Sequence, residues 1–223
     1  MTRHGDPFGW RWNEILAGQG GWGDYWQEPA PEVLAFLQQL RRQGARRVLD
    51  VGCGLGRHLV PLATLGLEAH GTDLSVEGLE YARRWLTQEG LSAELSLAEM
   101  AHLPYGDGSF DAAMAISVIN HGLRDDVAKA VAEVRRILKD GGFFLVTVTS
   151  KRAPAYGQGR RVGGDAFVHE DGGLIHYYVD RSGLSNLLRG FHLLEVVHKE
   201  EELLDLPQAR FRAYWVAVAR KAA

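Results

Sequence analysis

Residues 48–57 read Val-Leu-Asp-Val-Gly-Cys-Gly-Leu-Gly-Arg, and this stretch decides the fold class of the 223-residue chain. It begins as a short apolar strand pattern, runs into a glycine-rich turn and continues as a helical pattern. Glycine adopts left-handed backbone conformations and leaves no Cβ in the path of a ligand. Open α/β sheets bind their ligands at the carboxyl ends of the strands. The stretch therefore predicts a ligand that lies against this turn.

Strands and helices alternate along the chain around this turn. We expect strands at 47–51, 68–73, 93–98, 110–118, 143–148, 192–199 and 210–219, and helices at 32–40, 59–65, 75–89, 125–138 and 182–188. The alternation predicts βαβ units and a mainly parallel sheet, and the last two strands can pair as an antiparallel hairpin at its edge. Ser75 and either Asp125 or Asp126 are the expected helix N-caps.

The composition is that of an ordinary globular α/β domain. Hydrophobic residues make up 46% of the chain and charged residues 24%, and the formal net charge of -3 argues against a polyanion as the main partner. Cys53 is the only cysteine, so an internal disulfide and a cysteine-cluster zinc site are excluded. No stretch approaches the roughly 18 apolar residues of a membrane span, and the first residues lack a signal-peptide core. A cytoplasmic location is expected.

Two segments differ from the regular pattern. Residues 1–31 hold four of the six tryptophans among several glycines, and we interpret them as a leader that precedes the domain at 32–223. Tyr25 and Trp26 are hypothesised to form a lid over the bound ligands, because clustered apolar residues mark contact surfaces. Residues 151–180 show little periodicity, and so long a loop in a compact domain is usually functional or mobile. We expect this segment on the substrate side.

Two classes of cofactor compete for the glycine turn. A dinucleotide fingerprint reads G-x-G-x-x-G and places its pyrophosphate on a helix N-terminus. Here the glycines are Gly52, Gly54 and Gly56, and Arg57 stands where the fingerprint has its third glycine. This spacing suits a ligand without phosphate, whose amino-acid tail and sugar lie against the turn. The spacing favours that class only modestly.

The ends of the next two strands carry further acidic residues. Asp73 ends the second strand, where its carboxylate can accept hydrogen bonds from two ribose hydroxyls. Glu99 ends the third strand and can accept from an adenine amino group, while the amide of Met100 can serve a ring nitrogen. Dinucleotide-binding enzymes do not require the whole sequence at 98–111, so this segment favours the other cofactor class.

In combination these motifs resemble the class I S-adenosylmethionine-dependent methyltransferases of small molecules, over about residues 46–150. The resemblance implies a three-layer, doubly wound Rossmann-like fold with seven strands in the order 3-2-1-4-5-7-6 and strand 7 antiparallel. It implies S-adenosyl-L-methionine as the cofactor, with Asp50 orienting its amino group. The predicted cofactor-binding residues are Asp50, Gly52, Cys53, Gly54, Gly56, Arg57, Asp73, Leu74, Glu99, Met100, Ser117, Tyr25 and Trp26.

The acceptor side is predicted from the residues after the fourth strand. By resemblance, Ile119, Asn120 and His121 lie beside the methyl group. His121 can serve as a base or can simply bond a backbone carbonyl, and both interpretations stay open. Arg160 and His176 are further candidate substrate contacts. No metal site is expected, because the spacing of His169, Glu170, Asp171 and His176 is not diagnostic of one.

These features predict transfer of a methyl group to an O, N, S or C atom of a small molecule by in-line displacement. The Asp/Asn-Pro-Pro-aromatic motif of amino-directed DNA methyltransferases is absent, and so is a cysteine for cytosine methylation. Nucleic acid is therefore not expected as a partner. The alternatives are a protein that binds S-adenosylmethionine without turnover and a nicotinamide-dependent oxidoreductase.

Overall fold

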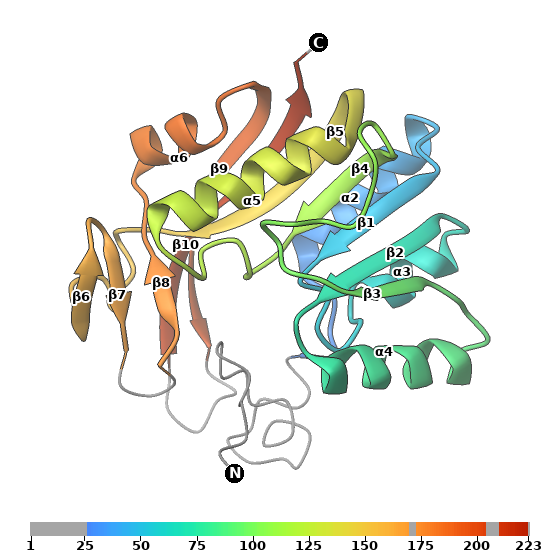
Figure 1. Ribbon diagram of the computed structural model, residues 1–223, viewed down its shortest axis with the longest axis horizontal. Coiled ribbons are helices and arrows are strands. Elements are labelled where there is room, and N and C mark those ends of the chain that lie inside the picture. The colour runs from blue at the N-terminus through green and yellow to red at the C-terminus, as the bar shows by residue number, and fades with distance from the viewer. Residues whose placement is uncertain (1–25, 170–172, 204–209, 223) are drawn as a thin grey trace.

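The computed structural model describes residues 26–169, 173–203 and 210–222. Its central sheet has the strand order β3-β2-β1-β4-β5-β10-β9 (Figure 1). The strands are β1 (Arg47–Val51), β2 (Glu68–Asp73), β3 (Glu94–Leu97), β4 (Phe110–Ala115), β5 (Leu138–Thr149), β9 (Phe191–Leu203) and β10 (Arg210–Lys221). The first five are parallel to one another, and β10 lies antiparallel between β5 and β9. The predicted order and the antiparallel closing hairpin are confirmed.

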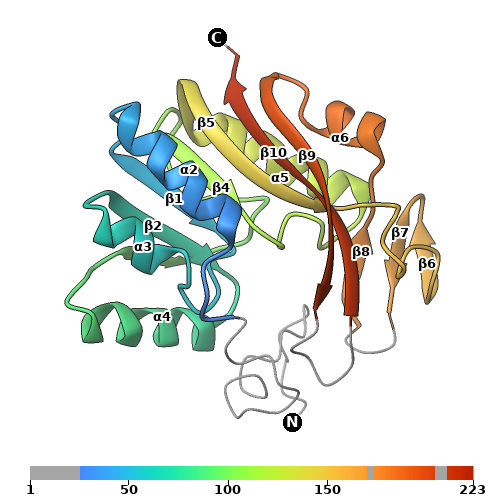
Figure 2. The ribbon, with the colours of Figure 1, turned by 180° about the vertical axis from the view of Figure 1, so that it is seen from behind.

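Helices cover both faces of the sheet, as Figures 1 and 2 show. One face carries α2 (Pro31–Arg42), α3 (Leu59–Thr64) and α4 (Val76–Gln88), and the other carries α5 (Arg124–Ile137) and α6 (Arg181–Leu187). Adjacent strand residues alternate between the two cores: Val48 shares a buried cluster with Phe36, and Leu49 shares one with Val131. Parallel sheets are stable when both faces are buried in this way. None of the helices in these described ranges is long and apolar enough to span a membrane.

The helix starts show where local sequence was sufficient and where it was not. Ser75 caps α4 as predicted, because its side chain accepts the N–H of Gly78 at 3.1 Å. The prediction of Asp125 or Asp126 as the N-cap of α5 is wrong. The N-cap is Leu123, and Asp126 acts from inside the first turn, where its Oδ2 accepts the N–H of Leu123 at 3.1 Å. A carboxylate at the third helical position, like one at the N-cap, satisfies an unpaired N–H at the helix start. A sequence pattern alone therefore does not separate the two positions.

The unpatterned segment between β5 and α6 contains a second, small antiparallel sheet. It consists of β6 (Arg160–Gly163), β7 (Ala166–Val168) and β8 (Ile175–Tyr177). Strands of three or four residues are too short for a visible alternation of polar and apolar residues. The loop between β4 and α5 holds β8 through two backbone hydrogen bonds, from Gly122 N to Ile175 O at 3.2 Å and from Tyr177 N to Asn120 O at 2.8 Å. The small sheet is thereby fixed beside the carboxyl end of the central sheet.

Helix α2 offers a direct test of this packing. Leu37 is 0% exposed and Leu34, one turn away on the same helix, is 44% exposed. We expect Leu37→Ala to lower the free energy of unfolding by about 2–5 kcal/mol, since it leaves a cavity against the sheet. Leu34→Ala should change it by less than about 0.5 kcal/mol. Urea unfolding followed by circular dichroism measures both, and equal losses would contradict the assigned packing.

Candidate active site

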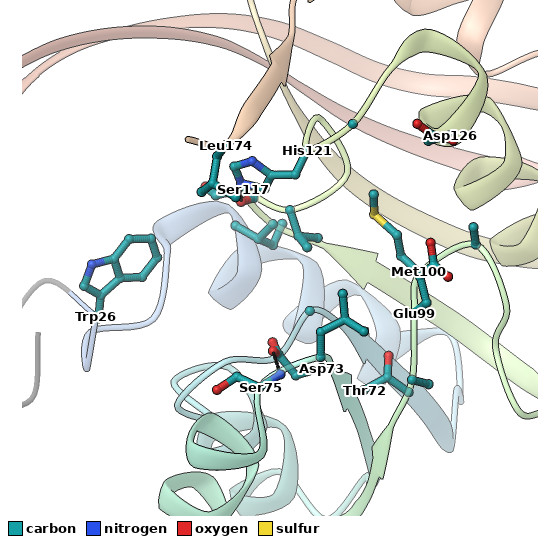
Figure 3. Close-up of a pocket in the computed structure, with 17 residues that line it drawn as sticks. Trp26, Thr72, Asp73, Ser75, Glu99, Met100, Ser117, His121, Asp126 and Leu174 are labelled. Atoms are coloured by element: carbon teal, nitrogen blue, oxygen red, sulfur yellow. Dashed lines mark hydrogen bonds between the residues drawn. The ribbon is translucent and has the colours of Figure 1, made fainter. Parts of the chain in front are cut away.

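A cavity of about 360 Å³ opens at the carboxyl ends of the central strands (Figure 3). Its size lies within the range of about 300–1,000 Å³ that small-molecule and cofactor sites occupy. Its position is the one that the glycine turn predicted. The lining residues are Trp26, Gly52, Thr72, Asp73, Leu74, Ser75, Ala98, Glu99, Met100, Ala101, Ile116, Ser117, Val118, His121, Gly122, Asp126 and Leu174.

Two glycines of the turn are required by their surroundings. Gly52 has a φ of 69°, and a Cβ there would overlap the side chain of Val118. Gly56 has a φ of 89°, and a Cβ there would lie 2.9 Å from the Cβ of Ala82 in α4. Positive φ values are costly for residues that carry a Cβ. The glycines therefore let the turn pack closely against Val118, after β4, and against α4.

Asp50, at the end of β1, is a buried carboxylate without a hydrogen-bond partner. Its side chain is 1% exposed and neither oxygen accepts a hydrogen bond. The nearest ionisable nitrogen is Nδ1 of His58, at 3.5 Å from Oδ2. Leaving a buried carboxylate unpaired is unfavourable, so this position fits a ligand that brings N–H donors or a positive charge.

Cys53 follows Asp50 in the turn and has a structural role in the backbone. Its N–H donates to Thr72 O at 2.9 Å, which ties the turn to the end of β2. Burial, and secondarily the charges of Asp50 and Asp73, raise the pKa of its thiol well above the usual value. Only the thiolate is an effective nucleophile, so Cys53 is not equipped for covalent chemistry.

Asp73, at the end of β2, organises the turn and faces the cavity. Its Oδ2 accepts the N–H of Gly54 and its Oδ1 accepts the N–H of Ser75, both at 2.8 Å. Burial raises the pKa of this carboxyl, and the two backbone hydrogen bonds oppose that shift. Each carboxylate oxygen has two lone pairs, so both can accept a further hydrogen bond. The geometry thus fits two neighbouring hydroxyl groups.

Glu99 and Met100 line the same cavity from the end of β3. The Glu99 side chain is about half exposed, and its Oε2 lies 3.3 Å from Nδ1 of His102. Figure 3 shows both side chains on the wall adjoining Asp73 and Thr72. Gly52 of the glycine turn, Asp73 at the end of β2 and Glu99 after β3 therefore line one cavity.

The segment after Met100 is held in place by α5. The guanidinium of Arg136 donates to the carbonyl oxygens of Leu103 at 3.0 Å and Tyr105 at 2.7 Å, and to Asp107 at 2.8 Å. Glu133, which pairs with Arg136, accepts the N–H of Leu103 at 2.9 Å. These bonds fix the backbone of a loop that has few partners of its own, and so keep the β3 end of the cavity in shape.

The far end of the cavity is built on the turn after β4. Ser117 has a φ of 58°, a strained value for a residue with a Cβ, and its N–H donates to Oγ1 of Thr147 at 2.7 Å. Nε2 of His121 lies 3.2 Å from the carbonyl oxygen of Ser117. Burial lowers the pKa of His121, so the imidazole is neutral near pH 7. A neutral imidazole on a cavity wall can accept a proton.

Trp26 closes the cavity from the side of the N-terminal segment. Its ring lies beneath the guanidinium of Arg57, with 4.8 Å between the ring centroid and Cζ. Arg57 is itself buried, and its Nη1 donates to Glu28 O at 3.4 Å. Trp26, which lies outside the domain core, is thereby packed against the glycine turn. Tyr25, predicted beside it, lies outside the described residues.

The predicted site residues fall into three groups. Seven line the cavity together: Trp26, Gly52, Asp73, Leu74, Glu99, Met100 and Ser117. His121 lines it from the acceptor side, while Asp50, Cys53, Gly54, Gly56 and Arg57 form the adjoining turn. Three candidates do not line it: Arg160 is exposed on β6, Asn120 is buried and bonds β8 through its carbonyl, and His176 lies on β8 with its ring 4.8 Å from that of His121.

Sequence reasoning overlooked His58, Asp126 and Leu174. His58 directly follows the glycine motif, and this adjacency was the available signal. Leu174 belongs to the unpatterned segment, where no signal existed. Among the residues that the structure describes, no group of three or more His, Cys, Asp and Glu side chains could hold a metal ion. Glu170 and Asp171, considered above, lie outside those residues.

Comparisons with known proteins agree with this geometry. Residues 49–146 match the model of a family described as "Methyltransferase domain". The chain is 37% identical to the methyltransferase GfsG of Streptomyces halstedii over 136 residues, which cover 55% of this chain and 48% of that protein. A SAM-dependent methyltransferase of Methanosarcina mazei superposes with a TM-score of 0.73 at 21% identity, covering 87% of this chain and 99% of that one. Residues 49–146 thus match a methyltransferase domain, and the fold of the chain is that of SAM-dependent methyltransferases.

The chain also superposes on a structure that contains two different bound ligands. This is the 1,6-didemethyltoxoflavin-N1-methyltransferase of Burkholderia thailandensis, with bound 1,6-didemethyltoxoflavin and S-adenosylhomocysteine. The TM-score is 0.66 at 22% identity, covering 95% of this chain and 85% of that one. The chain spans about half the length of the curated relatives it matches.

The cofactor of this class is S-adenosylmethionine, and the residues of the methyltransferase domain fit it. The unpartnered carboxylate of Asp50 suits the amino group of the methionine portion. Asp73 has free lone pairs for the ribose hydroxyls, and Glu99 can accept from the adenine amino group. This set favours S-adenosylmethionine over the nicotinamide cofactors that the glycine turn alone allowed.

Asp73 supplies the direct test of this cofactor site. We expect Asp73→Asn to weaken S-adenosylmethionine binding at least about tenfold, because an amide offers fewer acceptors and turns an NH2 toward backbone donors. Isothermal titration calorimetry measures the change. Asp125→Asn, at an exposed position on α5, is the matched control. Unchanged affinity in Asp73→Asn would contradict the assignment, as would equal binding of nicotinamide cofactors by the wild-type protein.

Proposed function

We propose that the chain is an enzyme that transfers the methyl group of S-adenosylmethionine to an O, N, S or C atom of a small-molecule acceptor. The observation that carries this proposal is the single cavity that joins Asp73 and Glu99 at one end to His121 and Leu174 at the other. A site that bound only the cofactor would not need the wall formed by His121 and Leu174. The 37% identity to the methyltransferase GfsG over 136 residues supports the same interpretation.

Bound S-adenosylmethionine supplies a methyl group already activated by its sulfonium sulfur. The chain therefore needs chiefly to hold two molecules in line and to exclude water. Asp50, Asp73 and Glu99 would hold the cofactor. Ile116 and Leu174 contribute an apolar wall on which an acceptor can be desolvated. Such positioning supplies about 7–11 kcal/mol of barrier reduction in well-oriented systems.

The charges around the cavity select the acceptor. Asp126 adds a carboxyl group to the wall beside Asp73 and Glu99, which are assigned to the cofactor, and none of the lining residues in the described part of the chain is Lys or Arg. A cleft with one sign of charge attracts ligands of the opposite sign and repels its own. The acceptor is therefore neutral or cationic, such as a phenol, an alcohol or an amine. Carboxylates, phosphates and nucleic acids are disfavoured.

Turnover with matched acceptors tests the function. The readout is conversion of S-adenosylmethionine to S-adenosylhomocysteine, with aromatic phenols and amines compared against carboxylic acids built on the same rings. We expect product from members of the first group and at least about tenfold less from the acids, because the wall carboxylates repel them. Tight cofactor binding without turnover on any acceptor would favour the non-catalytic alternative. Preference for the acids would contradict the charge argument.

His121 is proposed as the base for acceptors that must lose a proton. His121→Gln should lower kcat by about 10²-fold or more on a phenol or alcohol. Since the pKa of His121 is lowered by burial and the neutral imidazole is the active form, the wild-type rate should fall only as pH drops below 6.5. His192→Gln, on the exposed side of β9, is the control. An unchanged kcat and pH profile would contradict the role of His121 as the base.

A further inference from the structure

We propose that His58 is a positioning residue for the cofactor: its imidazole orients the Asp50 carboxylate toward the amino group of the methionine portion. This inference rests on the proposed cofactor site and deepens it. His58 directly precedes α3 and its side chain does not line the cavity. It would therefore act through Asp50 and not by touching the ligand.

The surroundings of His58 decide which ring nitrogen carries the proton. The side chain is 3% exposed, and its Nε2 accepts the N–H of Ala30 at 3.4 Å. An accepting Nε2 has no hydrogen, so in the neutral ring the proton is on Nδ1. Nδ1 lies 3.5 Å from Oδ2 of Asp50. The backbone of the N-terminal segment thus selects the tautomer that points an N–H at Asp50.

The contact between these side chains is incomplete. A separation of 3.5 Å is longer than a formed hydrogen bond, and both Asp50 oxygens are without one. A small rotation of the carboxylate would close the contact with His58 and leave the other oxygen for an ammonium group.

The charged groups around His58 determine how this arrangement depends on pH. Asp50 faces it from β1, Arg57 from the glycine turn and Glu32 from α2, and Asp73 lies on the far side of the turn. Burial outweighs the two acids and lowers the pKa of His58, so the ring is a neutral donor at pH 7. Protonation at lower pH makes an imidazolium that pairs with Asp50 and repels an ammonium. Affinity for ligands with an amino group should then fall below pH 6.5.

Two ligands separate this role from general folding effects. S-adenosylhomocysteine carries the amino group, and 5′-methylthioadenosine shares its adenosine but has no amino-acid portion. His58→Leu removes the donor to Asp50, whereas His58→Asn can place an amide N–H near the position of Nδ1. Calorimetric titration of the purified full chain with both ligands gives four dissociation constants to compare with wild type.

We expect His58→Leu to weaken S-adenosylhomocysteine about tenfold, the loss of one charge-assisted contact, with 5′-methylthioadenosine unchanged within about twofold. His58→Asn should bind both ligands nearly as wild type does. We define the preference as the affinity for S-adenosylhomocysteine divided by that for 5′-methylthioadenosine. As the pH is lowered from 7.5 to 5.5, this ratio should fall severalfold in the wild type and stay constant in His58→Asn. The pH comparison remains decisive if His58→Leu does not fold.

Equal weakening of both ligands in a folded His58→Leu variant would overturn the role of His58, and so would no weakening of either. A pH dependence that is the same in wild type and His58→Asn would also overturn it. These results leave the cofactor site intact, because wild-type binding is their reference. Failure of the wild type to bind either ligand would instead overturn the cofactor site and this inference together.

Discussion

The buried carboxylate of Asp50 is the constraint around which the cofactor end of the site is arranged. Its residue belongs to β1, at the centre of a sheet whose faces are both covered, so the charge has no route to bulk water. Burying a charge is tolerated only with partners or a ligand. The glycine turn, His58 and the N-terminal segment meet around this charge. The unfavourably buried carboxylate and the proposed contact to the cofactor are therefore the same group.

The parallel arrangement of the first five strands explains why the other cofactor contacts assemble beside Asp50. Carboxyl ends of neighbouring parallel strands lie at the same edge, and β1, β2 and β4 are adjacent there. Asp73 then links β2 to the turn through Gly54, while Arg136 of α5 holds the loop after β3. Helices on both faces leave this edge as the accessible part of the sheet. Rigid elements thus supply the cofactor contacts.

The acceptor end is constructed differently, from connections between strands. The turn after β4 carries the strained Ser117 and His121, and β8 is bonded directly to it. Trp26 approaches from the opposite side and is held by Arg57 of the glycine turn. Loops attached to a fixed core can change without disturbing it. The cofactor end therefore rests on the central strands, and the acceptor end on the connections between them.

The amino-acid sequence by itself determined the alternation of strands and helices, the glycine turn and the acids at three strand ends. Each of these depends on local spacing: apolar runs of strand length, glycines at fixed intervals and a carboxylate directly after a strand. Only the tertiary structure decided that His58 faces Asp50, that Arg160 does not line the cavity, and that Leu174, directly before β8, does. The last two depend on a segment whose strands are too short to show periodicity. Packing and hydrogen bonding, which no local pattern encodes, brought them together.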